Sequence, residues 1–363
     1  MGKYIFNGFT LVDNQLFGIQ RNTIELLKEL DRITDAGEIE LVIPPSEKFA
    51  NSFKNIKITK VGKPIAGSKF RKKTMTWLWK NFYYTAYIRR HTGVTIDSIL
   101  CFAKPSANIV FIYDCIPNMF PENYITQKQK KARKKLLRRQ KVAIENCNLL
   151  ITDSKHSKTD IERIYKPKCE IDVIYCGWQH YLDVREDDTV LSRFNLIPQH
   201  YYFSLGSRLP HKNSKWIVSA AQNNKNDTFV ITGSNLSNDK SEEMIGTDRN
   251  IIYTGYLTDG EIKCLMRNCK AFIQPSIYEG FGIPPMEAMS VGAKCIVSNV
   301  SSLPEVYKDY VWYINPKDPY IDLGDLLKNR VKDANDLLAM YSWENSAKKL
   351  YEVLKAYGKR DSV

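Results

Sequence analysis

Residues 274–299, QPSIYEGFGIPPMEAMSVGAKCIVSN, hold the side chains best suited to chemistry. Two carboxylates, Glu279 and Glu287, stand eight positions apart around two glycines and a Pro-Pro pair. Glycine lets the backbone approach a ligand, and proline suits a first helical turn, so the pattern predicts a helix start with Glu287 in its first turn. A helix start offers unpaired N–H groups to a phosphate, and carboxylates accept hydrogen bonds from sugar hydroxyls. The same pattern is also compatible with a helix that binds nothing, because a glutamate in a first turn is favourable in itself.

Short β-rich runs alternate with helical patterns along the whole chain, which predicts a parallel α/β architecture. In the first half the expected strands are 3–6, 40–43, 56–61, 96–102, 108–112, 149–153 and 171–175, and the expected helices are 19–30, 70–90, 124–147 and 155–164. The acidic, polar run 183–193 is interpreted as a linker. After it the expected strands are 201–205, 228–232, 251–253, 271–274 and 294–298, with helices at 213–222, 258–267 and 285–291. The pattern predicts two Rossmann-like, doubly wound domains facing a cleft, with ligands at the carboxyl ends of the strands.

The positive charge is concentrated in one part of the chain. The 363 residues contain 53 Lys+Arg and 40 Asp+Glu, a formal net charge of +13, and residues 48–141 hold 22 basic and 3 acidic residues. Residues 69–90 interleave aromatic side chains with cations, and residues 128–141 carry nine cations and no acid. Such runs can be solvated helix faces, or surfaces for an anionic membrane or a nucleic acid. No nucleic-acid-binding motif accompanies them.

Several features are absent from the sequence. No apolar run approaches the ~18–20 residues that a membrane-spanning helix needs. The beginning of the chain lacks the plan of a signal peptide, and the eight cysteines form no Cys-x-x-Cys pair, so reduced thiols in a cytoplasm are expected. The five histidines never stand at metal-ligand spacing, and no zinc site is expected.

The stretch 274–299 is similar to the E-x7-E signature of glycosyltransferase family 4, retaining enzymes with the two-domain GT-B fold. The segments SNVSSLPEV (298–306), FSLGSRLPHKN (203–213) and YSWENSAKKLYEVLKAY (341–357) resemble further blocks of that family, and the N-terminal half resembles it more loosely. The resemblance implies an acceptor-binding domain at 1–185, to which 341–358 cross back, and a nucleotide-sugar-binding domain at 194–340.

The resemblance also implies roles for individual residues. Glu279 would contact the donor sugar near the reacting centre, and Glu287 would accept hydrogen bonds from the nucleotide ribose. The diphosphate would be held by Arg208 and Lys212, by the backbone N–H groups of Phe281, Gly282 and Ile283, and by the backbone at Gly18. Negative charge builds on the departing phosphate as the glycosidic bond breaks, and fixed cations stabilise it. No Asp-x-Asp stands at a strand end to hold a metal, so a reaction without metal or other cofactor is expected.

Tyr113-Asp114 stands where the family often has His-Asp. Tyr113 could donate a hydrogen bond but is no base at neutral pH, since its unperturbed pKa is ~10. Asp114 could orient the acceptor or cap a turn before Pro117. In enzymes of this class the departing phosphate is thought to take the acceptor's proton, so the departure does not oppose the retaining reaction. His211 is interpreted as a loop residue.

Together these features predict a metal-independent, retaining hexosyltransferase. It would move a hexose or deoxyhexose from a nucleotide-diphosphate sugar to a lipid-linked or growing glycan of the lipopolysaccharide, O-antigen or capsule type. Because such acceptors are presented by membranes, the basic N-terminal domain is expected to dock on an anionic membrane rather than on nucleic acid, with the enzyme cytoplasmic and peripheral at the inner face of the cell membrane. Two alternatives remain: a sugar-nucleotide epimerase or hydrolase of GT-B fold, or a non-catalytic protein that binds membrane or nucleic acid.

Overall fold

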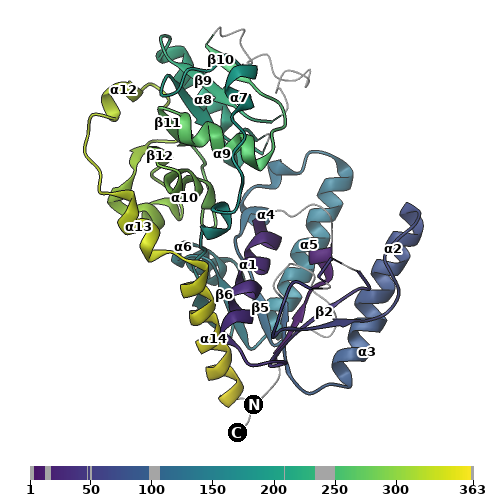
Figure 1. Ribbon diagram of the computed structural model, residues 1–363. Helices are drawn as coiled ribbons and strands as arrows, with labels where there is room; N and C mark the ends of the chain where they lie inside the picture. The colour runs from purple at the N-terminus through teal and green to yellow at the C-terminus, as the bar shows by residue number, and fades with distance from the viewer. Residues whose placement is uncertain are drawn as a thin grey trace. The chain divides into compact units, whose positions relative to one another are not determined.

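The computed structural model describes residues 4–12, 18–46, 48–49, 51–97, 107–207, 209–233 and 250–360. The chain forms two compact units, each built on one parallel sheet (Figure 1). Unit 1 comprises Met1–Cys115, Thr126–Cys176 and Trp343–Val363, and unit 2 comprises Ile116–Ile125 and Gly177–Ser342. No helix among the described residues is long and apolar enough to cross a membrane.

Unit 1 contains a seven-stranded sheet in the order β3-β2-β1-β4-β5-β6-β7. Its strands are β1 (Tyr4–Asn7), β2 (Ile39–Ile43), β3 (Lys57–Lys60), β4 (Val94–Asp97), β5 (Ile109–Phe111), β6 (Leu149–Thr152) and β7 (Glu170–Val173). Its helices are α1 (Gly18–Ile33), α2 (Lys69–Leu78), α3 (Tyr84–Arg89), α5 (Gln127–Asn146), α6 (Lys155–Tyr165) and α14 (Trp343–Arg360), with short 3-10 or π segments labelled η, here η1 (Phe9–Val12) and η2 (Trp79–Tyr83). All neighbouring strands pair in parallel, as expected when helices connect successive strands.

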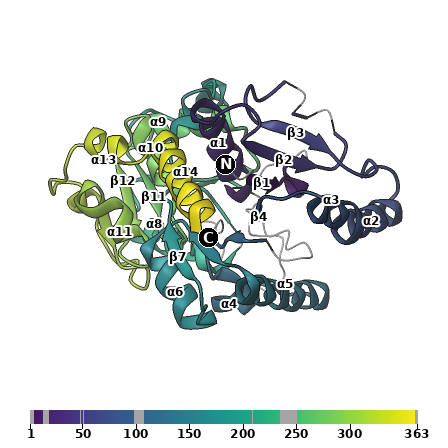
Figure 2. The ribbon, with the colours of Figure 1, turned by 90° about the horizontal axis from the view of Figure 1, so that it is seen from below.

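The C-terminal helix α14 belongs to unit 1, where it packs against α1 (Figure 2). The Tyr4 hydroxyl of β1 donates to the backbone carbonyl of Leu354 at 3.0 Å. The Tyr351 hydroxyl donates to the Glu38 carboxylate at 2.7 Å. These bonds join residues more than 300 positions apart in the chain. They confirm the prediction that the closing helix returns to the N-terminal half.

Unit 2 contains a six-stranded parallel sheet in the order β10-β9-β8-β11-β12-β13. Its strands are β8 (Tyr201–Ser204), β9 (Thr228–Ile231), β10 (Ile251–Tyr253), β11 (Ala271–Gln274), β12 (Cys295–Ser298) and β13 (Trp312–Ile314). Its helices are α4 (Ile116–Met119), α7 (Thr189–Arg193), α8 (Ser214–Asn223), α9 (Asp259–Asn268), α10 (Ile283–Ser290), α11 (Leu303–Tyr307), α12 (Leu323–Leu326) and α13 (Ala334–Met340). Short segments are η3 (Pro121–Asn123), η4 (Gln179–Tyr181), η5 (Pro210–Lys212) and η7 (Lys308–Tyr310).

The two parallel sheets confirm the predicted α/β class, and one local expectation is corrected. The expected linker 183–193 contains α7, because Val190 is fully buried and Arg193 forms an ion pair with Glu261 at 2.6 Å. The expected helix 70–90 is confirmed as a continuous helical run from Lys69 to Arg89, in which the π segment η2 separates α2 from α3. The last residues of the expected strand 96–102, from residue 98 on, lie outside the described residues.

Trp79 is the side chain that attaches this divided helix to unit 1. Its indole is fully buried, donates from Nε1 to the Val61 carbonyl at 3.0 Å, and stacks on Tyr84 with ring centroids 5.0 Å apart. It packs with Ile5 and Val42 of the sheet. Two positions earlier, Trp77 is 55% exposed. One tryptophan therefore anchors the segment and its neighbour does not.

Replacing Trp79 by Ala should destabilise unit 1 by about 3–5 kcal/mol, because a large buried ring and its hydrogen bond are removed. Trp77→Ala is the matched control and should cost at most about 1 kcal/mol, since this side chain is 55% exposed. Thermal unfolding of both variants measures the difference. Equal losses of stability would contradict this account of the anchor.

Candidate functional site

The loop between β11 and α10 carries the glycines and carboxylates singled out in the sequence. Gly282 precedes α10 with φ +89°, and a Cβ there would lie 2.8 Å from Leu303 Cδ2. The positive φ therefore favours glycine, and a Cβ there would also have to displace the Leu303 side chain. Pro284 and Pro285 occupy the first turn, as predicted. Because α10 begins at Ile283, Glu287 lies in the second turn rather than the first, which corrects the prediction and weakens its interaction with the helix dipole.

The Glu279 carboxylate is buried in this loop and held by three side chains. Lys212 Nζ lies 2.8 Å from Oε1 and 2.9 Å from Oε2. Oε1 also accepts hydrogen bonds from Gln274 Nε2 at 3.0 Å and Ser276 Oγ at 2.6 Å. Within the described part of the chain, Oε2 accepts from Lys212 alone. One oxygen is thus fully engaged, and the other keeps acceptor capacity for a ligand hydroxyl.

Hydroxyl groups fix the backbone of the same loop. The hydroxyls of Ser301 and Ser302 donate to the Glu279 carbonyl at 2.8 and 3.0 Å. The Tyr307 hydroxyl donates to the Gly282 carbonyl. The backbone N–H groups of Gly282 and Ile283 donate to no residue that the structure describes. The carbonyls of Glu279 and Gly282 therefore accept hydrogen bonds within the protein, while the N–H groups of Gly282 and Ile283 remain available to an anion at the start of α10.

Lys212 reaches Glu279 from η5, the turn between β8 and α8. Asn213 next to it has φ +57°, and its side-chain amide donates to the carbonyls of Pro275 and Pro316 at 3.0 and 2.9 Å. The bond to Pro275 joins the η5 turn to the loop that carries Glu279. The lysine side chain is 31% exposed, whereas the Glu279 side chain is 7% exposed. Arg208, the other predicted diphosphate ligand, lies outside the described residues.

His211 is a buried neutral imidazole beside this pair. Its Nδ1 lies 2.9 Å from Asn123 Nδ2, and the Phe120 ring packs against it with centroids 5.6 Å apart. Both partners come from 116–125, a segment that the sequence did not connect with the site. Burial, and secondarily the charge of Lys212, lowers the pKa of His211 to about 4. At neutral pH this histidine therefore carries no charge.

The Glu287 carboxylate has a partner that the sequence did not suggest. His180 Nε2, in η4, lies 2.8 Å from Glu287 Oε1, and both side chains are nearly buried. The two residues are 107 positions apart, so no local motif could connect them. The imidazole fixes the orientation of the carboxylate and leaves Oε2 without a bond to any described side chain.

Three predicted site residues belong to unit 1. Gly18 begins α1 and is exposed, and a Cβ there would meet no described atom within 4 Å. Tyr113 follows β5, is buried, and has its hydroxyl 3.4 Å from Thr23 Oγ1. Burial raises the pKa of Tyr113 well above its ordinary value, so its hydroxyl stays protonated. Asp114, next in the chain, is half-buried.

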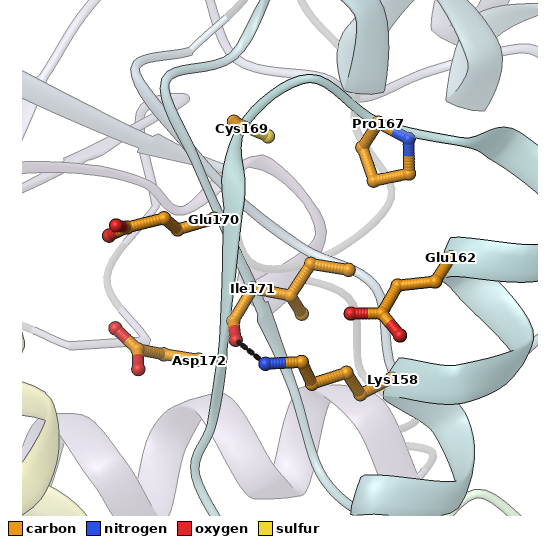
Figure 3. Close-up of a pocket in the computed structure, with 7 residues that line it drawn as sticks. All are labelled: Lys158, Glu162, Pro167, Cys169, Glu170, Ile171 and Asp172. Atoms are coloured by element: carbon orange, nitrogen blue, oxygen red, sulfur yellow. Dashed lines mark hydrogen bonds between the residues drawn. The ribbon is translucent and has the colours of Figure 1, made fainter.

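A surface depression of about 370 Å³ in unit 1 contains none of the predicted site residues. It lies between α6 and β7, where Lys158 donates to the Ile171 carbonyl at 2.8 Å (Figure 3). Carboxylates of Glu162, Glu170 and Asp172 complete much of its lining, so it is unsuited to a diphosphate. Among all the described residues, those of this depression included, no group of three or more His, Cys, Asp or Glu is arranged to hold a metal ion.

Two parallel α/β units, with carboxylates and a lysine in the loops that follow strands of the second, have the architecture of the GT-B fold. Residues 192–359 match the family described as Glycosyl transferases group 1. The matched part of the chain, residues 192–359, belongs to this family, glycosyltransferase family 4, and the chain as a whole has the GT-B fold.

The chain is similar to individual proteins over most of its length. It is 25% identical to O-antigen chain mannosyltransferase B of Escherichia coli, covering 91% of this chain and 93% of that protein. It is 27% identical to O-antigen chain mannosyltransferase RfbU of Salmonella typhimurium, covering 65% of this chain and 66% of that protein. The structure of sucrose-phosphate synthase from Thermosynechococcus elongatus superimposes with a TM-score of 0.71 at 12% identity, covering 99% of this chain and all of that one, so it supports the fold alone.

The neutral state of His211 predicts a pH dependence. The unfolded chain binds a proton on this imidazole below pH 6.5, whereas the folded protein does so only near pH 4, so His211 makes stability fall as the pH drops through that window. His211→Gln should lose less thermal stability than the wild type between those two pH values, and His200→Gln, at an exposed histidine, should behave like the wild type. Identical pH profiles for all three proteins would show that folding does not lower the pKa of His211.

Proposed function

We propose that the protein is a retaining mannosyltransferase that extends a cell-surface glycan from a nucleotide-diphosphate sugar. The observation that carries the proposal is the pair formed by the buried Glu279 and the partly exposed Lys212 in the loops before α10, whose free acceptor and donor groups suit a sugar and a diphosphate. Similarity to O-antigen chain mannosyltransferases over most of the chain supports mannose as the transferred sugar and a glycan as the acceptor.

In this proposal the donor's diphosphate lies between Lys212 and the N–H groups of Gly282 and Ile283. Charge that develops on the departing β-phosphate is stabilised by the ammonium group and by the oriented N–H dipoles, without a metal ion. Arg208 and the backbone of Phe281 supply further donors, as the family resemblance implies. Because this positive end of α10 is fixed before the donor binds, little reorganisation accompanies the reaction.

Glu279 would position the sugar in this arrangement. Its Oε2 accepts a hydroxyl of the transferred hexose, while Oε1 stays engaged with Gln274 and Ser276. Glu287 would accept from the nucleotide ribose through Oε2, with His180 holding Oε1. The departing phosphate would then take the proton of the attacking acceptor hydroxyl on the same face, which retains the anomeric configuration.

The acceptor side is assigned to unit 1, with Tyr113 and Asp114 as weak orienting groups. The protonated Tyr113 is a hydrogen-bond donor and not a base. The growing glycan would be lipid-linked, which places the enzyme at the inner face of the membrane.

Glu279→Gln should lower transfer from GDP-mannose by roughly a hundredfold or more, because the amide offers a weaker acceptor and leaves Lys212 without its counter-charge. Release of GDP, with and without an added glycan acceptor, measures the effect. Glu344→Gln, at an exposed carboxylate paired with Lys348, is the matched control and should retain wild-type turnover. Unchanged turnover of Glu279→Gln would overturn the assignment, and donor consumption without acceptor would favour an epimerase or hydrolase.

Gly18→Ala should weaken donor binding without loss of stability, because the added methyl meets no described atom of the protein and the family resemblance assigns the backbone at Gly18 to the donor phosphates. Calorimetric titration with GDP-mannose should show at least roughly tenfold weaker binding, with an unchanged unfolding midpoint. Wild-type affinity in this variant would remove Gly18 from the donor site.

A further inference from the structure

The described residues of unit 1 expose their large aromatic side chains in one place. Phe70, Trp77 and Phe82 are 81%, 55% and 55% exposed, and all three lie on α2 and η2. Helix α2 buries none of its side chains and stands at the edge of unit 1 (Figure 1). Isolated exposed apolar residues are ordinary, but aromatic side chains gathered on one short segment mark an interaction surface.

The π segment η2 brings two of these rings together. Phe82 follows Trp77 by five positions, which would place the two on different sides of a regular α-helix. In the wider π turn they meet edge to face, with ring centroids 5.4 Å apart. The buried Trp79 between them holds this turn on the sheet. The exposed aromatic pair therefore lies on a turn that the buried Trp79 holds against the sheet.

The stretch of sequence that carries these rings is basic. Residues 48–96 contain no Asp or Glu. Lys69, Arg71, Lys72 and Lys73 on α2 are exposed, and none of them forms an ion pair with a residue that the structure describes. The surface thus combines protruding aromatic rings with uncompensated cations.

We propose that Phe70, Trp77 and Phe82 form a wedge that inserts into the interface of an anionic lipid bilayer, with the α2 cations on the lipid phosphates. Aromatic rings at the headgroup boundary and flanking Lys/Arg are the chemistry of interfacial helices. A second copy of the chain is a poor occupant, because the same positive surface would face itself. Single-stranded nucleic acid is bound in grooves lined with cations, whereas this segment protrudes.

This inference goes beyond the sugar-transfer reaction and does not depend on it, because binding to vesicles is measured without donor or acceptor. Wild-type protein should bind phosphatidylcholine vesicles that contain phosphatidylglycerol, and should bind pure phosphatidylcholine vesicles much less. The double variant Phe70→Ser/Trp77→Ser should bind the anionic vesicles at least roughly tenfold more weakly. Tyr320→Ser is the matched control, since it removes a 78% exposed aromatic residue of unit 2, and it should bind like the wild type.

Fluorescence quenching by brominated lipid tests whether the aromatic rings insert into the bilayer or whether the protein is held at the surface by charge alone. Brominated lipid should quench part of the tryptophan fluorescence of the wild type. In Trp77→Phe, which preserves the apolar ring, vesicle binding should persist and that quenching should be lost. Lys72→Glu/Lys73→Glu should weaken binding and reduce its dependence on salt.

The following results would overturn the proposal. One is the absence of binding to anionic vesicles, and another is binding that the Phe70→Ser/Trp77→Ser variant retains in full. Self-association that disappears in that variant, measured by light scattering, would instead assign the surface to a homodimer. Oligonucleotide binding with the same dependence, in the absence of vesicle binding, would assign it to nucleic acid.

Discussion

The ion pair between Glu279 and Lys212 is the interaction on which the site depends. A buried carboxylate is costly unless it is paired and hydrogen-bonded, and Glu279 satisfies both conditions through Lys212, Gln274 and Ser276. The pair connects the turn after β8 with the loop after β11, two neighbouring strands of the unit 2 sheet. The same interaction therefore holds these two loops together and places the Lys212 ammonium group near the start of α10.

Most of the surrounding structure serves to keep this arrangement in one conformation. Gly282 has a backbone angle that only glycine adopts easily, and the Tyr307 hydroxyl holds its carbonyl. Ser301 and Ser302 hold the Glu279 carbonyl in the same way. A charged site that is fixed in advance stabilises developing charge better than one that must reorganise, which gives these bonds a role in the proposed transfer reaction.

The sequence predicted what depends on local spacing. The strand-loop-helix around Glu279 and the prolines of the first turn followed from the residues themselves, and the return of the closing helix followed from the family resemblance. It did not predict contacts between distant positions, such as His180 with Glu287, or Asn123 with His211 from a segment that joins unit 2. Nor did composition distinguish the buried Trp79 from the exposed Trp77, because the π turn that separates them depends on packing against the sheet.

A crystal structure of the protein with a bound nucleotide-diphosphate mannose tests the central claim most directly. The account predicts Lys212 Nζ and the Gly282 and Ile283 N–H groups within hydrogen-bonding distance of the diphosphate, and a sugar hydroxyl on Glu279 Oε2. Gln274 and Ser276 should still hold Oε1. A donor bound away from the start of α10, with Glu279 contacting no part of the sugar, would contradict it.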